Sequence, residues 1–154
     1  MDTKNDKSEL QNIHDLLVDS QEGYMKAAER VEDGSVRMLL AAFAHERIVL
    51  ASEVEAELRE QAPEAEAKES GTIKGDLHRA WMDLRDALST SDHANVLSEC
   101  ERGEGYLLMR YDEVLKKDDL QPGTRMLASH QRAEVQGNLE RIKQLRKTFE
   151  KIES

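Results

Sequence analysis

The sequence has little of several residue types that mark common protein classes. Of its 154 residues, one is cysteine, two are proline and 4% are aromatic, and its longest apolar run spans only residues 38–44. A single cysteine excludes an internal disulfide framework and a cysteine-rich zinc module. An apolar run of this length is far too short to cross a bilayer, and two prolines argue against a loop-rich chain.

Basic residues are also scarce relative to acidic ones. Lys and Arg total 22 against 32 Asp and Glu, which gives a net charge of −10. A phosphate backbone or an anionic lipid surface is met by a basic protein surface, so this charge argues against nucleic acid and membrane as partners. The first residues are polar and lack the apolar region of a secretory signal. We therefore expect a cytoplasmic protein with one domain over residues 1–154, of which 1–7 are flexible.

Helical periodicity, in contrast, runs through the whole chain. Apolar residues recur at spacings of three and four along four long segments, and no strand pattern competes with them. The first predicted helix ends at a turn at 32–34. The other three long helices are predicted at 36–59, 93–117 and 124–152, with Ser35 as the N-cap of the second helix. Residues 61–90 form a long connection that contains a short amphipathic helix at 76–88. Two antiparallel hairpins joined by one crossover predict an all-α, ferritin-like four-helix bundle.

Three stretches of the chain also carry a family resemblance. They are DSQEGY at 19–24, GTIKG followed by LHRAWMDL within 71–84, and ECERGE at 99–104. With them, residues 8–150 resemble a bacterial, ferritin-like four-helix-bundle family that is a domain of unknown function. The resemblance implies a ferritin-like fold and brings no established activity with it.

The metal-binding motif of ferritin-like proteins is missing from the sequence. Di-iron proteins of this architecture use a Glu on each of two helices and a Glu-x-x-His motif on each of the other two. Residues three apart share a helix face, so such a pair can hold one metal ion together. No Glu or Asp of this chain is followed by His three residues later.

Polar residues nevertheless interrupt the apolar stripes of all four helices. Glu104 and Glu134 are each 15 residues from Asp119 in one turn, while Gln21 and Glu46 are 12 and 13 residues from Asp33 in the other. Equal distances from the turn of an antiparallel hairpin correspond to equal heights along the bundle. We therefore predict a buried polar layer at mid-bundle, made of Gln21, Arg47, Glu104, Gln131, Glu134 and Asn138.

Three interpretations of this layer are open at the level of sequence. In the first, Arg47 is a fixed cation that pairs with Glu104 and Glu134 in a structural network. In the second, oxygen ligands hold a divalent metal such as iron, manganese or zinc without histidine, although a nearby arginine would oppose the cation. The ligands would be Glu104, Glu134, Glu22 and Glu46, helped by Glu101 or His130. In the third, the stripes are misplaced by one position and the polar residues face solvent.

The remaining candidate residues favour structural roles. Cys100 lies at an interior helical position with no adjacent His, which is typical of a small packing residue. The five His share no spacing typical of a zinc site, and we expect them on the surface or at helix ends. An acidic run at 53–69 and a basic last helix at 141–151 could orient self-association.

The leading functional hypothesis is therefore a non-catalytic structural or interaction protein with a degenerate di-metal site and no cofactor. A role in stress is added only by analogy with ferritin-like proteins. The alternative is a metal-binding protein for iron storage or di-metal oxidation. Its carboxylates would be those of the mid-bundle layer.

Overall fold

Four long helices make up the described part of the chain. The computed structural model describes residues 5–63 and 93–153, and within these ranges there is no strand. The helices are α1 (Lys7–Arg30), α2 (Gly34–Gln61), α4 (His93–Leu115) and α5 (Pro122–Glu153). The all-α prediction is confirmed, and each predicted long helix is present. The short helix predicted at 76–88 lies outside the described residues.

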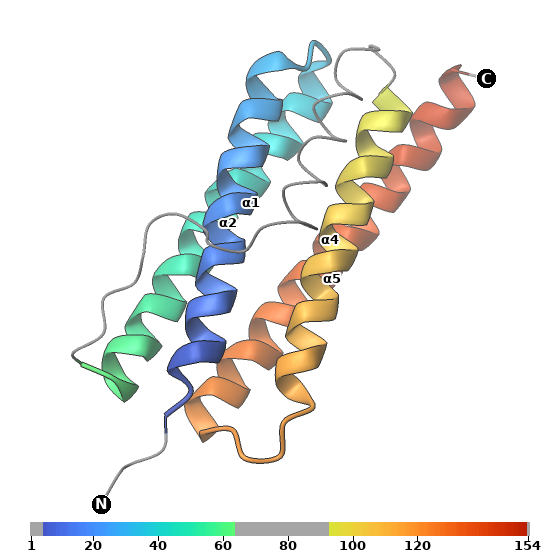
Figure 1. Cartoon of the computed structure of the whole chain (residues 1–154). Coiled ribbons are helices and arrows are strands. Elements are labelled where there is room, and N and C mark those ends of the chain that lie inside the picture. Colours follow the sequence, from blue (N-terminus) through green and yellow to red (C-terminus); the bar gives the residue numbers. More distant parts are fainter. Residues whose placement is uncertain (1–4, 64–92, 154) are drawn as a thin grey trace, which may run out of the picture.

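The helices pair as two antiparallel hairpins that pack side by side. α1 pairs with α2 and α4 with α5, while α1 also contacts α4 and α2 contacts α5 (Figure 1). α2 and α4 run in the same direction, so the chain between them joins opposite ends of the bundle. This is a four-helix bundle with one long crossover, as the sequence predicts. Every pair of neighbouring helices is antiparallel.

The helix starts differ slightly from the predicted ones. Asp33, and not Ser35, is the N-cap of α2, because its carboxylate accepts a hydrogen bond of 2.9 Å from the backbone N–H of Val36. Gly34 is therefore the first residue of the helix and not a stop signal. α5 begins at Pro122, two residues before the predicted start, because the first turn of a helix tolerates a residue without an N–H.

The interior consists of two apolar clusters, one above the other. The lower cluster includes Leu17, Leu50 and Tyr111, and the upper cluster includes Tyr24, Phe43 and Ile142. Most residues of the predicted stripes lie in one of them. Ile152 is a correction, since it is 71% exposed. α5 has 32 residues against the 23 of α4, so its last turn reaches past the start of its hairpin partner.

A network of polar side chains, which we call the clasp, ties the two hairpins together at the lower end of Figure 1. The Gln61 amide donates to Thr124 Oγ1 (2.7 Å), and its Oε1 accepts from the Asp6 N–H (2.9 Å). Asp6, although buried, accepts from the Gln121 N–H at 2.8 Å. A Cβ atom at Gly123 would lie 2.5 Å from the Glu57 carboxylate, so a side chain here would require the Glu57 side chain to move.

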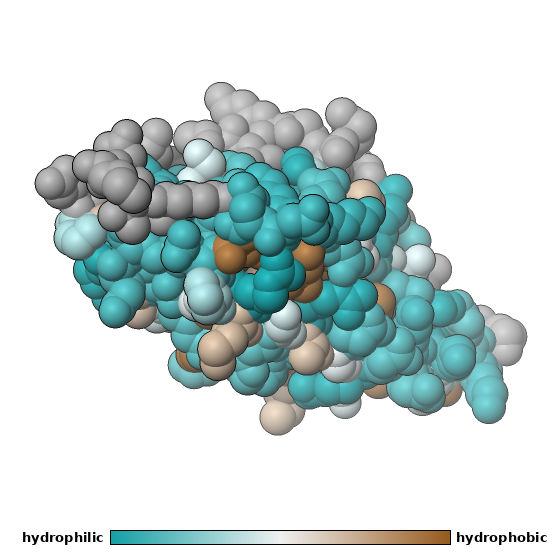
Figure 2. Space-filling view, turned by 90° about the horizontal axis from the view of Figure 1, so that it is seen from below, coloured by the Kyte–Doolittle hydropathy of each residue, from teal (hydrophilic) through white to brown (hydrophobic). Residues whose placement is uncertain are grey.

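The surface at this end is mainly hydrophilic. Viewed from below, hydrophobic residues show as small, scattered patches on a mostly hydrophilic surface (Figure 2). Among the described helices, none is long and apolar enough to cross a membrane.

Candidate functional site

The centre of the bundle holds a fully buried guanidinium group. Arg47 of α2 has no exposed side-chain surface and lies between the two apolar clusters. Its Nη1 donates to Glu46 Oε1 at 2.7 Å, its Nε donates to Ser20 Oγ at 3.0 Å, and its Nη2 donates to Glu104 Oε1. The Arg47 pKa is lowered by burial and raised by Glu104. The net shift is upward, so the group stays charged.

Glu104 of α4 is a buried carboxylate next to Arg47. It is 1% exposed, and its Oε1 accepts from both Arg47 and the Tyr24 hydroxyl. Burial first, and the Glu104 charge second, hold the pKa of Tyr24 well above its usual value, so its hydroxyl keeps its proton. Glu104 Oε2 has no hydrogen-bond partner within the described chain. One oxygen of this carboxylate therefore accepts every hydrogen bond found for it.

Glu46 extends the layer towards α5 and the surface. Its Oε1 accepts from Asn138 Nδ2 at 2.5 Å as well as from Arg47, and its side chain is 23% exposed. Burial raises the pKa of Glu46, and the neighbouring Arg47 opposes that shift without cancelling it. Groups from α1, α2, α4 and α5 thus meet at one height, which we call the Arg47 layer.

A second polar group lies below the Arg47 layer. Gln131 of α5 is fully buried, and its Oε1 accepts from the Tyr111 hydroxyl at 2.6 Å. Its amide nitrogen donates to the Leu50 carbonyl (3.0 Å) and to Glu53 Oε1 (3.1 Å). Burial raises the pKa of Tyr111, which keeps this hydroxyl a donor at neutral pH. Gln131 therefore binds the backbone of one hairpin to a side chain of the other.

The sequence-predicted layer is present in part. Arg47, Glu104, Gln131 and Asn138 are buried. Glu134, in contrast, is 47% exposed, because the buried stripe of α5 passes through Val135. Gln21 is only half buried and donates to Met25 Sδ at 3.8 Å, while its neighbour Ser20 contacts Arg47.

The four carboxylates proposed as metal ligands do not come together. Glu104 and Glu46 meet at Arg47, whereas Glu22 and Glu134 are exposed. His130 lies 3.8 Å from Glu134 on the surface, and Glu101 pairs with Arg146 at 2.7 Å. Within residues 5–63 and 93–153, no group of three His, Cys, Asp or Glu side chains is placed to hold a metal ion.

The cysteine and the histidines divide between core and surface. Cys100 is buried, and burial together with Glu104 raises the pKa of its thiol, which disfavours the reactive thiolate. His45 and His130 are exposed, as expected. His14 is a correction, since it is 2% exposed and its Nε2 lies 2.8 Å from Glu55 Oε1.

Sequence reasoning missed the hydroxyl groups of the site. Ser20, Tyr24 and Tyr111 all bond to residues of the polar network, but only polar side chains that break an apolar stripe were considered as members. A buried tyrosine needs a partner for its hydroxyl. The sequence does contain a signal for the two tyrosines, because each lies on an apolar stripe and close to an interior polar residue that could bond to its hydroxyl.

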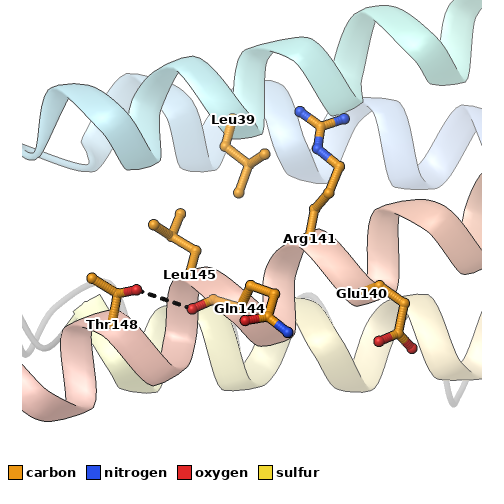
Figure 3. A pocket seen from close by; sticks show the side chains of 6 residues that line it. All are labelled: Leu39, Glu140, Arg141, Gln144, Leu145 and Thr148. Carbon is orange, nitrogen blue, oxygen red and sulfur yellow. Dashed lines mark hydrogen bonds between the residues drawn. The ribbon is translucent and has the colours of Figure 1, made fainter.

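A separate groove lies on the outside of the bundle between α2 and α5. Leu39 and Leu145 point towards each other across it, and the Thr148 hydroxyl donates to the Gln144 carbonyl of its own helix (Figure 3). At the other end of the groove, the Arg141 guanidinium lies 5.7 Å from the centre of the Phe43 ring. These side chains present no converging set of catalytic or metal-binding groups.

Comparisons with known proteins agree with the expected family. Neither the curated proteins nor the solved structures contain a match to the chain. Residues 6–117 match the family described as Domain of unknown function (DUF2383), and the whole of α5 lies beyond the matched part. This match covers more than half of the 154 residues, and the chain therefore belongs to that family of unknown function.

Proposed function

We propose that this protein is a non-catalytic, ferritin-like bundle whose Arg47 layer is a structural element in place of a di-metal site. The single observation that carries the proposal is the buried Arg47 guanidinium, which pairs with the carboxylates of Glu104 and Glu46. The function that follows is that of a stable helical scaffold for interaction with other protein surfaces.

The chemistry of the layer supports a resident cation that belongs to the protein. A guanidinium is always charged and carries several donors in a fixed plane, so it meets two carboxylates and a hydroxyl at once. A divalent metal at the same carboxylates would lie next to this charge, and their repulsion would oppose binding. Glu104 and Glu46 also come from different hairpins, so Arg47 links the two halves of the bundle.

The alternative is a metal-binding protein that takes up iron, manganese or zinc at Glu104 and Glu46. The test is metal analysis of protein purified after growth with each metal, together with oxygen consumption on addition of Fe(II). We expect metal well below one equivalent and no Fe(II)-dependent oxygen uptake. The matched control for Glu104→Ala is Glu22→Ala, which removes an exposed carboxylate. A stoichiometric metal that is lost with Glu104→Ala and kept with Glu22→Ala would overturn the proposal.

A further inference from the structure

Every methionine in the described part of the chain lies on the surface. Met25 is on α1, Met38 on α2, Met109 on α4 and Met126 on α5, so each helix carries one. Met38 and Met126 are 75% and 74% exposed, and Met109 and Met25 are 53% and 46% exposed. None of the four belongs to either apolar cluster. The other two methionines of the sequence lie outside the described residues.

This placement is the reverse of the usual one. Methionine is among the residue types most often fully buried, because it is apolar and fills irregular gaps in a core. The buried apolar residues of this bundle are instead Leu, Ile, Val, Ala, Phe and Tyr, with one Cys. The four thioethers therefore contribute little to the packing of the bundle, and a chemical change at one of them costs the fold little.

An exposed thioether is open to oxidation by peroxides. A lone pair of the sulfur attacks one peroxide oxygen, the O–O bond breaks and an S=O bond forms, while the other oxygen of hydrogen peroxide leaves as water. The sulfur loses two electrons and the peroxide gains them. The sulfoxide is polar, so it disrupts a core that contains it, whereas at the surface it is solvated. In this bundle the reaction is therefore compatible with the native packing.

The thiol of the chain is protected where the thioethers are not. Cys100 is buried, and burial together with Glu104 raises the pKa of its thiol, so the reactive thiolate is disfavoured. A peroxide in solution therefore meets the methionine sulfurs first.

The surroundings of the four sulfurs predict an order of reaction. The Gln21 amide donates a hydrogen bond to Met25 Sδ, with 3.8 Å between nitrogen and sulfur. This hydrogen bond engages a sulfur lone pair, and Met25 is also the least exposed of the four. We therefore expect Met38 and Met126 to react first, Met109 next and Met25 last.

We propose that Met25, Met38, Met109 and Met126 are reversible oxidation sites, at which the bundle accepts oxygen from peroxides in this order and keeps its fold. A methionine sulfoxide reductase reverses the step, because two of its thiols supply two electrons, form a disulfide and release the oxygen as water. These sites are on the surface, so this role and that of the Arg47 layer can fail independently of each other.

The first test follows each site in time. The protein is treated with excess hydrogen peroxide, and peptide mass spectrometry measures the gain of one oxygen atom at each methionine. Met38 and Met126 are expected to react within about twofold of free N-acetylmethionine, and Met25 at least about threefold more slowly. Gln21→Glu keeps the shape of the side chain without its N–H donors, and should raise the rate of Met25 towards that of Met109.

A matched control places a thioether in the core. Leu17 is fully buried, and Leu17→Met is a change of similar volume that the bundle should tolerate. Its sulfur is expected to react at least ~10-fold more slowly than that of Met38 in the native state, because peroxide reaches it only when the bundle opens.

The second test measures the fold. Thermal unfolding followed by circular dichroism is compared before oxidation, after oxidation of all four sites and after treatment with methionine sulfoxide reductases. Oxidation of the unchanged protein is expected to shift Tm by less than about 4 °C, which is about 1 kcal/mol for a chain of this size, and the reductases are expected to restore the original masses.

Four results would overturn the proposal. One is a larger loss of Tm on oxidation, which would show that the thioethers support the fold. The second is a reaction of Met38 or Met126 that is no faster than that of the buried methionine in Leu17→Met. The third is a Met25 that reacts as fast as Met38, and the fourth is a set of sulfoxides that the reductases leave unreduced.

Discussion

Removing the buried cation should destabilise the bundle strongly. Arg47→Met keeps an apolar stem of similar length but leaves the Glu104 carboxylate, 1% exposed, without its positive partner. Breaking a buried pair by removing one member costs about 3–5 kcal/mol, because the remaining charge stays buried. For a chain of this size, 1 kcal/mol corresponds to about 2–4 °C in Tm, so we expect a decrease of roughly 6–20 °C.

The assay is thermal and urea unfolding at pH 7, followed by circular dichroism at 222 nm. The double variant Arg47→Met/Glu104→Met is decisive, because replacing both members of a buried pair by apolar residues is often neutral or stabilising. We therefore expect the double variant to be more stable than Arg47→Met alone. Arg132→Ala is the control, since Arg132 pairs with Asp112 on the surface and such pairs contribute about 0–1 kcal/mol.

Two results would refute this reasoning. One is a loss of less than about 1 kcal/mol in Arg47→Met, which is the size of a surface pair. The other is strict additivity in the double variant, because residues that share a buried ion pair must show a coupling energy. If Arg47→Met does not fold, Glu104→Gln supplies the measurement, since its amide oxygen still accepts from Arg47 and only the charge is lost.

Three further predictions concern single residues. Gln131→Leu leaves the Tyr111 hydroxyl without its acceptor and should cost about 1–3 kcal/mol in urea unfolding, and adding Tyr111→Phe should restore part of that loss. Asp33→Ala removes the N-cap of α2 and should cost about 1 kcal/mol, whereas Ser35→Ala should change little. Burial raises the pKa of Glu46, so the native state binds the proton of this carboxyl more tightly than the unfolded state does. Glu46 therefore stabilises the native state below the usual glutamate pKa, and this stabilisation is lost as the pH rises. Glu46→Gln should therefore flatten the pH dependence of the urea midpoint above the usual glutamate pKa, and an unchanged slope would contradict the assignment.

The helices could be predicted because the apolar spacing follows the helical period over long segments. The crossover followed from the length of residues 61–90, which is too long for a turn between adjacent antiparallel helices. The cap was harder, because Asp33 and Ser35 are both good N-cap residues and only the backbone geometry shows which one accepts from Val36.

The site was predictable where a charge interrupts an apolar stripe. Arg47 and Glu104 stand out for this reason, and both are at the centre of the bundle. Where two neighbouring residues could both continue a stripe, spacing alone did not decide. From Gln131, both Glu134 and Val135 lie one turn further on, and packing buries the valine because burying an unpaired carboxylate costs far more.

The clasp at the lower end of the bundle has a consequence for how the two hairpins come apart. The clasp joins the hairpins through hydrogen bonds of Asp6, Gln61 and Thr124, which lie at the ends of three helices. At the other end, the upper cluster holds the hairpins together mainly through apolar side chains. Regions of a native protein open locally with different free energies, which amide hydrogen exchange resolves residue by residue. We expect the amides of Leu10 and Ala128 to exchange only on global unfolding, and those near Phe149 to exchange earlier through separation at the upper end. The two hairpins would then separate at the upper end of the bundle while they stay joined at the end where α1 begins.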